Sequence, residues 1–483
     1  MANSTRDIQI DSALPLCVGL DNVLVRTNTL HEQVLLLRKQ PPLAVAAVLS
    51  ALFFRGIAAF RHELARRVAL RADLLPYNEK LLSYLQRESA RGRRIILVTA
   101  ADRIVAEAIA KHLGIFETVL APDDAAGLDS RRRAEEITGY LGNGGFIYAG
   151  SSRSEGAIWD AASAVVAVNP TFWARRAMRH AGLRVVAEFN DGFAPGDAIR
   201  AIRAYQWLKN LLVFIPAFLS HNILNISKIV PGVIAFAALS ATASAIYIFN
   251  DIFDLEADRQ HPRKRRRPFA SGSIPIAHGV LMALVLLGVA LALSYKLPAA
   301  AKALILLYAV ASALYTIRLK SLLFVDVVIL SGLYTLRILF GGAASSIVIS
   351  PWALAFSMFI FTSLAICKRL SELRSREVEK PILLPGRAYS QTDIVPLTAL
   401  ACSSGYLAMV VLALYLNSPE VLLLYRNPKI MWLLLPVLMY WIGRAIMLSN
   451  RGAMHDDPIL FAIGDVPSWL VFFMTLGVVI AAI

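Results

Sequence analysis

Long apolar runs recur through the second half of the 483-residue chain and limit what it can fold into. From about residue 205 onward, each run is close to the roughly 20 residues that cross a bilayer as a helix, and short polar stretches separate the runs. A chain with 57% hydrophobic residues arranged in this way is not an ordinary soluble protein. The pattern predicts an all-α polytopic membrane bundle with about nine spans, at residues 205–221, 229–250, 277–295, 301–317, 322–344, 352–367, 394–416, 429–448 and 467–483.

The first 195 residues follow a different pattern. The stretches LPLCVGL (14–20), RRIILVT (93–99) and GFIYAG (145–150) read as short apolar strands, and each leads through a turn or a loop into a helical stretch. Strand, turn and helix in succession predict an α/β domain with a parallel sheet and crossover helices. We therefore expect an α/β domain over 1–195 and a membrane domain over 196–483.

The ends of these strands match, in order, the motif positions of the haloacid dehalogenase (HAD) superfamily, which the first domain resembles. That superfamily has an Asp nucleophile and a second Asp two residues on, where this chain has Gly19 and Asp21. The hydroxyl of the second motif is kept as Thr99, but the metal-binding acids become Ser151 and Glu155. An acyl-phosphate route needs a carboxylate nucleophile, and Mg2+ needs oxygen anions. We expect this HAD-like (Rossmannoid) domain to be catalytically inactive, with a regulatory, scaffolding or ligand-holding role.

One segment of this domain, LAVAAVLSALFF (43–54), is apolar and is followed by Arg55, Arg61, Arg66 and Arg67. Twelve residues are too few to span a bilayer. The segment is expected either to be a buried helix or to lie in the membrane interface with its arginines at the headgroups. Both alternatives bring the domain close to the membrane.

Charge indicates the orientation of the chain. The N-terminus lacks the pattern of a signal peptide, so the first domain is expected in the cytoplasm. Loops on that side hold most of the basic residues of the membrane domain, and the opposite loops hold only Lys228, Lys296, Lys302 and Arg426. The positive-inside rule then predicts a multi-pass protein of the inner (cell) membrane with its active-site loops in the cytoplasm. The net charge of +15 follows from this topology, with anionic lipid and phosphate ligands, and needs no nucleic acid.

Oxygen-bearing side chains cluster at the cytoplasmic end of the second span. Asn250, Asp251, Asp254 and Asp258 are spaced by one, three and four residues, so on a continuing helix they share one face. Such a face would repel itself unless a cation lay among its members. Mg2+ suits hard oxygen ligands and commonly bridges to substrate phosphates.

Basic residues follow this acidic face at once, namely His261, Lys264, Arg265, Arg266 and Arg267. A solvated positive-inside loop would explain the basic residues but not the carboxylates that precede them. The alternation of carboxylates and cations predicts a site for a diphosphate and Mg2+.

The pattern NDxxDxxxDxxHPxKxxRPxAxG (250–272) is similar to the first signature of the UbiA superfamily of intramembrane prenyltransferases. The resemblance extends over about 195–483, and the stretch 315–345 resembles the second signature region. KRLSEL (368–373) and NRGAMHDDP (450–458) resemble the branch that contains decaprenyl-phosphate phosphoribosyltransferase.

One departure distinguishes the branches. Aromatic prenyltransferases of the superfamily usually carry a second DxxxD, but here Asp326 is followed four residues on by Leu330. The resemblance thus implies Mg2+-dependent transfer of a 5-phosphoribosyl group from phosphoribosyl diphosphate to a polyprenyl phosphate at the cytoplasmic face, releasing diphosphate. The alternative is a prenyltransferase that moves a polyprenyl chain from its diphosphate to an aromatic or other acceptor. A third alternative is a non-enzymatic scaffold, against which the intact acidic set argues; a homo-oligomer stays open.

The resemblance also implies roles for individual residues. The expected catalytic residues are Asp251, Asp254, Asp258, Lys264 and Arg267, and the expected metal ligands are Asn250, Asp251, Asp254 and Asp258. The expected substrate-binding residues are His261, Tyr315, Lys320, Asp326, Arg337, Lys368, Arg369 and Glu372. Arg337 lies inside an apolar span, which is unfavourable unless it faces a ligand or an acid. Asp456 and Asp457 are weaker candidates.

Overall fold

The computed structural model describes residues 14–122, 129–142, 144–191, 194–374, 388–419, 421, 425–454 and 457–483. The chain divides into two compact units. The first unit comprises Met1–Ile202 and Tyr247–Ala283, and the second comprises Arg203–Ile246 and Leu284–Ile483. The segment that carries the first signature is therefore grouped with the N-terminal α/β domain.

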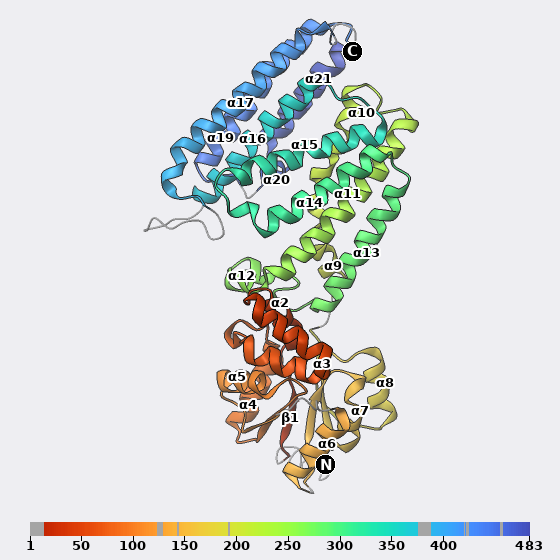
Figure 1. Ribbon diagram of the computed structural model, residues 1–483, viewed down its shortest axis with the longest axis vertical. Coiled ribbons are helices and arrows are strands. Elements are labelled where there is room, and N and C mark those ends of the chain that lie inside the picture. The colour runs from red at the N-terminus through yellow and green to blue at the C-terminus, as the bar shows by residue number, and fades with distance from the viewer. Residues whose placement is uncertain are drawn as a thin grey trace, which may run out of the picture. The chain divides into compact units, whose positions relative to one another are not determined.

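A six-stranded parallel sheet forms the centre of the α/β domain, which confirms the predicted fold (Figure 1). The strands are β1 (Leu16–Gly19), β2 (Ile95–Val98), β3 (Thr118–Leu120), β4 (Ile147–Gly150), β5 (Ala164–Val168) and β6 (Val185–Phe189). Their order is β3-β2-β1-β4-β5-β6, so the strands that carry the three HAD-like motifs are neighbours. The sheet changes direction of growth at β1, where open α/β sheets place their ligand crevice.

Helices connect these strands. They are α2 (Thr29–Leu37), α3 (Pro42–Arg67), α4 (Glu79–Ala90), α5 (Arg103–Leu113), α6 (Ser130–Leu141), α7 (Gly156–Ala161), α8 (Phe172–His180) and α9 (Pro195–Ala201), with short 3-10 turns η1 (Ala72–Leu74) and η2 (Arg153–Glu155). β1, β2 and β4 are buried along their whole length, as near-continuous apolar strands of a sheet covered on both faces should be.

Helix α3 is longer than the twelve-residue segment predicted from the sequence, because it runs from Pro42 to Arg67 through a kink at Gly56 (φ 85°). It is long and apolar enough to cross a membrane. One face packs into the domain through residues such as Leu64, whereas Phe53 and Phe54 are 81% and 87% exposed. The helix is thus buried along one face only, so it is not a wholly buried helix, and its location in the membrane interface stays a prediction.

The polytopic part is helical, as predicted. Its helices are α11 (Ile226–Phe253), α12 (Leu255–Gln260), α13 (Ile276–Tyr295), α14 (Ala299–Ile317), α15 (Val325–Ser345), α16 (Pro351–Arg374), α17 (Ile394–Leu416), α19 (Leu434–Asn450), α20 (Pro458–Gly464) and α21 (Val466–Ala482). Among the described residues, eight helices, α3 included, are long and apolar enough to span a membrane, and α21 is a shorter apolar helix. The protein is an integral membrane protein.

The first predicted span, 205–221, is not a membrane-length α-helix. It folds as a 3-10 helix, η3 (Ala204–Phe214), followed by the short helix α10 (Ile215–Leu219). Lys209 and Asn210 are buried in it and contact Asp457 and Ser240, respectively. These polar contacts bind the segment to other residues of the protein. The sequence pattern, in which the stretch reads as an apolar span, did not predict them.

Candidate functional site

The acidic residues of the first signature lie where one helix gives way to another. Helix α11 ends at Phe253, Asp254 leaves the helical region (φ −92°, ψ 13°), and α12 begins at Leu255. The expectation of one continuous helix was therefore wrong at this residue. Hydrogen bonds still link the turns, since the N–H of Asp254 donates to the carbonyl of Asn250 and the N–H of Asp258 donates to that of Asp254.

Arg267 joins two of these acids. Its Nη1 lies 3.1 Å from Oδ1 of Asp251 and 2.7 Å from Oδ2 of Asp258, and both carboxylates are buried. Two buried carboxylates can approach this closely because a cation lies between them. Burial raises the pKa of Asp258, although the Arg267 guanidinium beside it acts in the opposite direction. The carboxylates of Asp251 and Asp258 thus bind a cation between them.

The amide of Asn250 offers a further oxygen. Its Oδ1 is buried and has no hydrogen-bond partner among the residues that the structure describes. Buried carbonyl oxygens normally have a partner, so this atom fits a metal ligand. Across the same described residues, no group of three or more His, Cys, Asp or Glu side chains forms a site for a metal ion. Mg2+ is commonly held by only one or two carboxylates together with substrate phosphates, and that arrangement fits the residues present.

The basic half of the first signature has a distinct structure. Nδ1 of His261 accepts the backbone N–H groups of Arg263 and Lys264 at 3.2 and 3.4 Å, which holds the start of the 3-10 turn η4 (Lys264–Arg266). The Lys264 side chain is exposed. His261 therefore has a local structural contact in addition to its predicted binding role.

In the second unit, three predicted residues surround the guanidinium of a fourth, Arg369. Nε of Arg369 lies 2.9 Å from Oδ2 of Asp326, and both side chains are fully buried. Arg369 also contacts Glu372, and its Nη2 lies 3.3 Å from Oη of Tyr315. Oη of Tyr389 donates to Oδ1 of Asp326 at 2.6 Å. The carboxylate of Asp326 is therefore held by a cation and a hydroxyl.

Arg337 is buried in α15 against neutral groups. It donates to Oδ1 of Asn210 at 3.0 Å, to the carbonyl of Leu333 at 2.6 Å and to Oη of Tyr308 at 3.0 Å. Its guanidinium also lies 5.0 and 5.1 Å from the ring centroids of Tyr308 and Tyr334. These contacts give the arginine a structural reason for its place inside an apolar helix, beside the predicted role in binding.

A second charged group lies around Asp457. Its carboxylate forms an ion pair with Lys209 and lies 3.9 Å from Nζ of Lys368. Lys320 is half-buried on the 3-10 turn η5 (Leu319–Ser321), and Asp456 lies outside the described residues. Sequence reasoning missed Lys209, although a lysine within a predicted apolar span was a usable signal. Tyr389, which binds Asp326, gave no such signal.

An apolar cavity of about 420 Å³ opens within the second unit. Residues of η3, α10, α16, α17 and α19 line it: Leu208, Leu211, Leu212, Ile215, Phe356, Ile360, Phe361, Leu364, Met409, Leu438 and Trp441. Trp441 is the single lining side chain with a polar atom, and that indole N–H donates to Ser468. The cavity suits a hydrocarbon group.

The HAD-like motif positions form a closed arrangement of their own. A Cβ at Gly19 would lie 3.3 Å from Oη of Tyr148, so the tyrosine stands next to the position of the absent nucleophile. That hydroxyl donates to Glu155, which also accepts the N–H groups of Ser151 and Ser152. Glu155 is thereby engaged in hydrogen bonds that hold the turn after β4.

Comparison with protein families places both parts of the chain. Residues 213–477 match the model of the UbiA prenyltransferase family. Residues 24–139 match that of the haloacid dehalogenase-like hydrolases.

Similar proteins cover the chain to different extents. The protein y4nM of Sinorhizobium fredii is 34% identical over 469 residues, which is 95% of this chain and 89% of y4nM. Nodulation protein NoeC of Azorhizobium caulinodans is 34% identical over 55% of this chain and 86% of its own length. Decaprenyl-phosphate phosphoribosyltransferase of Corynebacterium glutamicum is 35% identical over 37% of this chain and 55% of its own length. A UbiA homologue of Archaeoglobus fulgidus bound to DMAPP and Mg2+ aligns with 58% of this chain and 98% of its own, at 14% identity and a TM-score of 0.45.

Proposed function

Because the chain belongs to the UbiA prenyltransferase family, we propose that it is a membrane transferase that moves a 5-phosphoribosyl group from phosphoribosyl diphosphate to a polyprenyl phosphate. The observation that carries this proposal is the group formed by Asp251, Arg267 and Asp258. The buried, unsatisfied oxygen of Asn250, the residue before Asp251, supports it. When the diphosphate leaves carbon, the enzyme must stabilise the departing anion. A buried acidic pair that already holds a cation, followed at once by basic residues, suits this task.

The roles of the residues follow from that requirement. The proposed Mg2+ ligands are Asn250, Asp251, Asp254 and Asp258. Because no three of these carboxylates gather in the described residues, one or two of them would hold the ion together with the diphosphate, to whose oxygens the bound ion supplies positive charge. The side chains of Lys264 and Arg267 would neutralise the negative charge of the leaving diphosphate or of the 5-phosphate. The acceptor phosphate is already a nucleophile, so the transfer requires no strong general base. The roles in substrate binding predicted for the charged residues of the second unit are part of the same proposal.

Two observations support phosphoribosyl rather than prenyl transfer. The acid that a second DxxxD would require is replaced by Leu330, and Asp326 is engaged by Arg369 and Tyr389. In addition, the chain is similar to proteins named decaprenyl-phosphate phosphoribosyltransferase over 55% to 61% of their length.

The acceptor in this proposal is a lipid. The apolar cavity of the second unit, about 420 Å³ in volume, would take part of a polyprenyl chain, because its lining is almost wholly hydrocarbon. The excess of Lys and Arg in the loops on the side of the N-terminal domain supports a cytoplasmic location for the reaction.

We also infer that the domain over residues 1–195 has no phosphatase activity of its own. Gly19 stands where the HAD superfamily has its nucleophile, and the Tyr148 hydroxyl lies next to that position. A covalent phosphoryl intermediate cannot form on glycine.

The test is a transfer assay in membranes that contain the protein. Radiolabelled phosphoribosyl diphosphate is added with polyprenyl phosphate and Mg2+, and lipids are extracted and counted. We expect label in the lipid fraction with the wild-type protein and none with Asp251→Asn. A parallel reaction supplies labelled polyprenyl diphosphate and 4-hydroxybenzoate; label in the aromatic product alone would overturn phosphoribosyl transfer in favour of prenyl transfer.

A further inference from the structure

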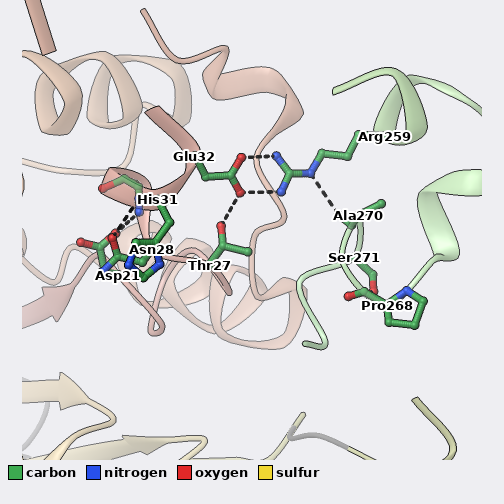
Figure 2. Close-up of polar contacts among 10 residues, drawn as sticks. Asp21, Thr27, Asn28, His31, Glu32, Arg259, Pro268, Ala270 and Ser271 are labelled. Carbon is green, nitrogen blue, oxygen red and sulfur yellow. Dashed lines mark hydrogen bonds and ion pairs between the residues drawn. The ribbon is translucent and has the colours of Figure 1, made fainter. Parts of the chain in front are cut away.

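A buried ion pair connects the N-terminal domain to the first signature. Glu32 of α2 accepts two hydrogen bonds from Arg259 of α12, Nη1 to Oε2 at 2.9 Å and Nη2 to Oε1 at 2.6 Å (Figure 2). The side chains of Arg259 and Glu32 are 6% and 5% exposed, respectively. They lie 227 residues apart in the chain, and both belong to the first unit. A bidentate pair between a guanidinium and a carboxylate fixes orientation as well as distance.

The pair is extended on both sides. Oγ1 of Thr27 donates to Oε1 of Glu32 at 2.7 Å, and Nε of Arg259 donates to the carbonyl of Ala270 at 3.0 Å. The resulting chain runs from Thr27 through Glu32 and Arg259 to Ala270, as Figure 2 shows. It therefore joins Arg259 to Ala270, near the two ends of the segment 259–272. It also connects both residues to α2 of the N-terminal domain.

The position of Glu32 depends on the degenerate first motif of the HAD-like domain. Oδ1 of Asp21 accepts the N–H of Thr29 at 2.7 Å, and Oδ1 of Asn28 accepts the N–H groups of Leu30 and His31. These bonds cap the first turn of α2, where free N–H groups would otherwise remain, and Glu32 lies in that turn. The residues that surround the missing nucleophile thus hold a helix that contacts the transferase signature.

Other contacts hold the residues just before this segment, and the end of the segment itself. Nη2 of Arg38 donates to the carbonyl of Phe253 at 2.5 Å, and its guanidinium lies 5.1 Å from the centroid of the Phe253 ring. Lys39 forms an ion pair with Glu256. At the other end, Gly272 has φ +71°, and a Cβ there would lie 2.7 Å from Cβ of Arg26. Glycine allows both this conformation and this close approach.

Arg267 lies within the held segment, three residues before Ala270. The backbone carbonyl of Arg267 accepts the N–H of Ser271, and its side chain lies between Asp251 and Asp258. We propose that Glu32 is a positioning residue of the transferase, which acts through Arg259 to hold the segment 259–272 so that Arg267 meets the acidic pair. The kinetic part of this inference rests on the proposed function, whereas the structural part does not.

The experiment compares full-length variants in detergent. Glu32→Gln keeps the shape of the side chain but removes its charge, Glu32→Asp keeps the charge, and Thr27→Ala removes one hydrogen bond. The matched control is Glu63→Gln, which removes an ion pair with Arg67 within α3 of the same domain. Hydrogen exchange of the amides in 259–272 and the Mg2+ concentration that gives half-maximal turnover are measured with kcat, KM and the melting temperature.

We expect Glu32→Gln to accelerate hydrogen exchange in the segment, to lower kcat on the order of 10- to 100-fold and to raise the Mg2+ concentration needed for half-maximal turnover. Loss of a residue that orients metal-binding groups has effects of this size in other metal sites. Thr27→Ala should shift the same readouts less, and Glu32→Asp should restore part of kcat. Exchange, kcat and Mg2+ requirement that stay at wild-type values in Glu32→Gln and Thr27→Ala would overturn the proposal. So would effects equal to those of Glu63→Gln.

The outcome separates the two proposals. If the wild-type protein transfers neither phosphoribosyl nor prenyl groups, the proposed function fails, and the exchange rates still test whether Glu32 holds the segment. If Glu32→Gln does not fold, Thr27→Ala and Glu32→Asp carry the comparison, because both keep a carboxylate opposite Arg259.

Discussion

At the scale of single residues, the pair Asp251 and Asp258 shows how buried like charges are tolerated. Arg267 approaches both carboxylates within 3.1 Å, and the neighbouring residue in the chain, Asn250, has a buried oxygen without a hydrogen-bond partner among the described residues. Each acid is useful only together with a cation, because two buried carboxylates without one repel each other. This dependence makes the site sensitive to conservative substitutions.

We predict that Asp251→Asn and Asp254→Asn each lower turnover on the order of 100-fold or more, since each removes a carboxylate that would hold the Mg2+ needed to neutralise the leaving diphosphate. Both variants should remain folded in detergent, which size-exclusion chromatography would check. Transfer should also cease when Mg2+ is removed by a chelator and return when it is added. Wild-type rates from either variant without added metal would contradict the prediction.

Asp21 illustrates a functional position that has become structural. Its Oδ1 accepts the N–H of Thr29, a contact that an acid in the turn after a strand commonly makes. We predict that Asp21→Ala lowers the free energy of unfolding by about 1 to 3 kcal/mol, because a buried N–H loses its acceptor. Folded Asp21→Ala protein should still catalyse transfer, because Asp21 has no part in the chemistry, with a partial loss of rate from the weaker capping of α2, which carries Glu32.

The conservative substitution separates charge from hydrogen bonding. Burial raises the pKa of Asp21 above its ordinary value of 3.8, so the folded protein binds this proton more tightly than the unfolded chain does. The contribution of Asp21 to the free energy of unfolding is therefore greatest at low pH and declines as the pH rises above 3.8. Asp21→Asn keeps the acceptor without the charge, and we expect it to melt at or above the wild-type temperature at pH 7. Melting as low as that of Asp21→Ala would show that the charge itself is needed.

At the scale of elements, the length of the helices and the charge of the loops between them predict which loops lie on the cytoplasmic side. The loop after α12 is rich in arginine, whereas the segment after α17 is not. We predict that a reporter fused after Arg265 lies in the cytoplasm and one fused after Ser418 lies on the opposite side. A phosphatase and a fluorescent-protein fusion at each point provide complementary signals. Identical locations for the two points would refute the predicted arrangement of spans.

Helix α3 leads to a second prediction at this scale. Leu43, Phe53 and Phe54 are more than 80% exposed, and arginines follow on the same helix. An exposed apolar face of this kind with neighbouring basic residues suits the membrane interface. We predict that a photoreactive residue at position 54 labels lipid in intact membranes, whereas one at the exposed Glu107 of α5 does not. Equal labelling at both positions would exclude specific contact of α3 with lipid.

At the scale of the whole molecule, the chain unites a HAD-like domain with a UbiA-family membrane bundle. The first signature is grouped with the N-terminal sheet domain rather than with most of the bundle. Gly19 stands where the HAD superfamily has its nucleophile, and α2 of the same domain contacts the signature through Glu32.

We predict that the full-length protein does not hydrolyse p-nitrophenyl phosphate or sugar phosphates with Mg2+. Gly19→Asp should not restore hydrolysis, since a Cβ at this position already lies 3.2 Å from Val23 and 3.3 Å from Tyr148. Release of phosphate measured colorimetrically would check both proteins. Hydrolysis by the wild type that disappears in Asp21→Ala would mean that another residue has replaced the missing nucleophile.

The sequence by itself determined the parallel α/β domain, the apolar helices after residue 225, the HAD-like motif positions and the UbiA signature. Each of these depends on local properties of the chain, namely the length of apolar runs, strand-turn-helix order and the spacing of a few residue types. The spacing of Asn250, Asp251 and Asp258 singled out these residues in this way, and their role in binding stays a prediction.

Tertiary structure alone decided which distant residues meet. The pairs Glu32–Arg259 and Asp326–Arg369, and the hydroxyl of Tyr389 on Asp326, join positions that no spacing rule connects. The 3-10 form of η3 has the same origin, because Lys209 and Asn210 find polar partners only in the folded protein. A buried charge or amide takes its conformation from the partner that compensates its desolvation, and that partner is chosen by packing rather than by the neighbouring sequence.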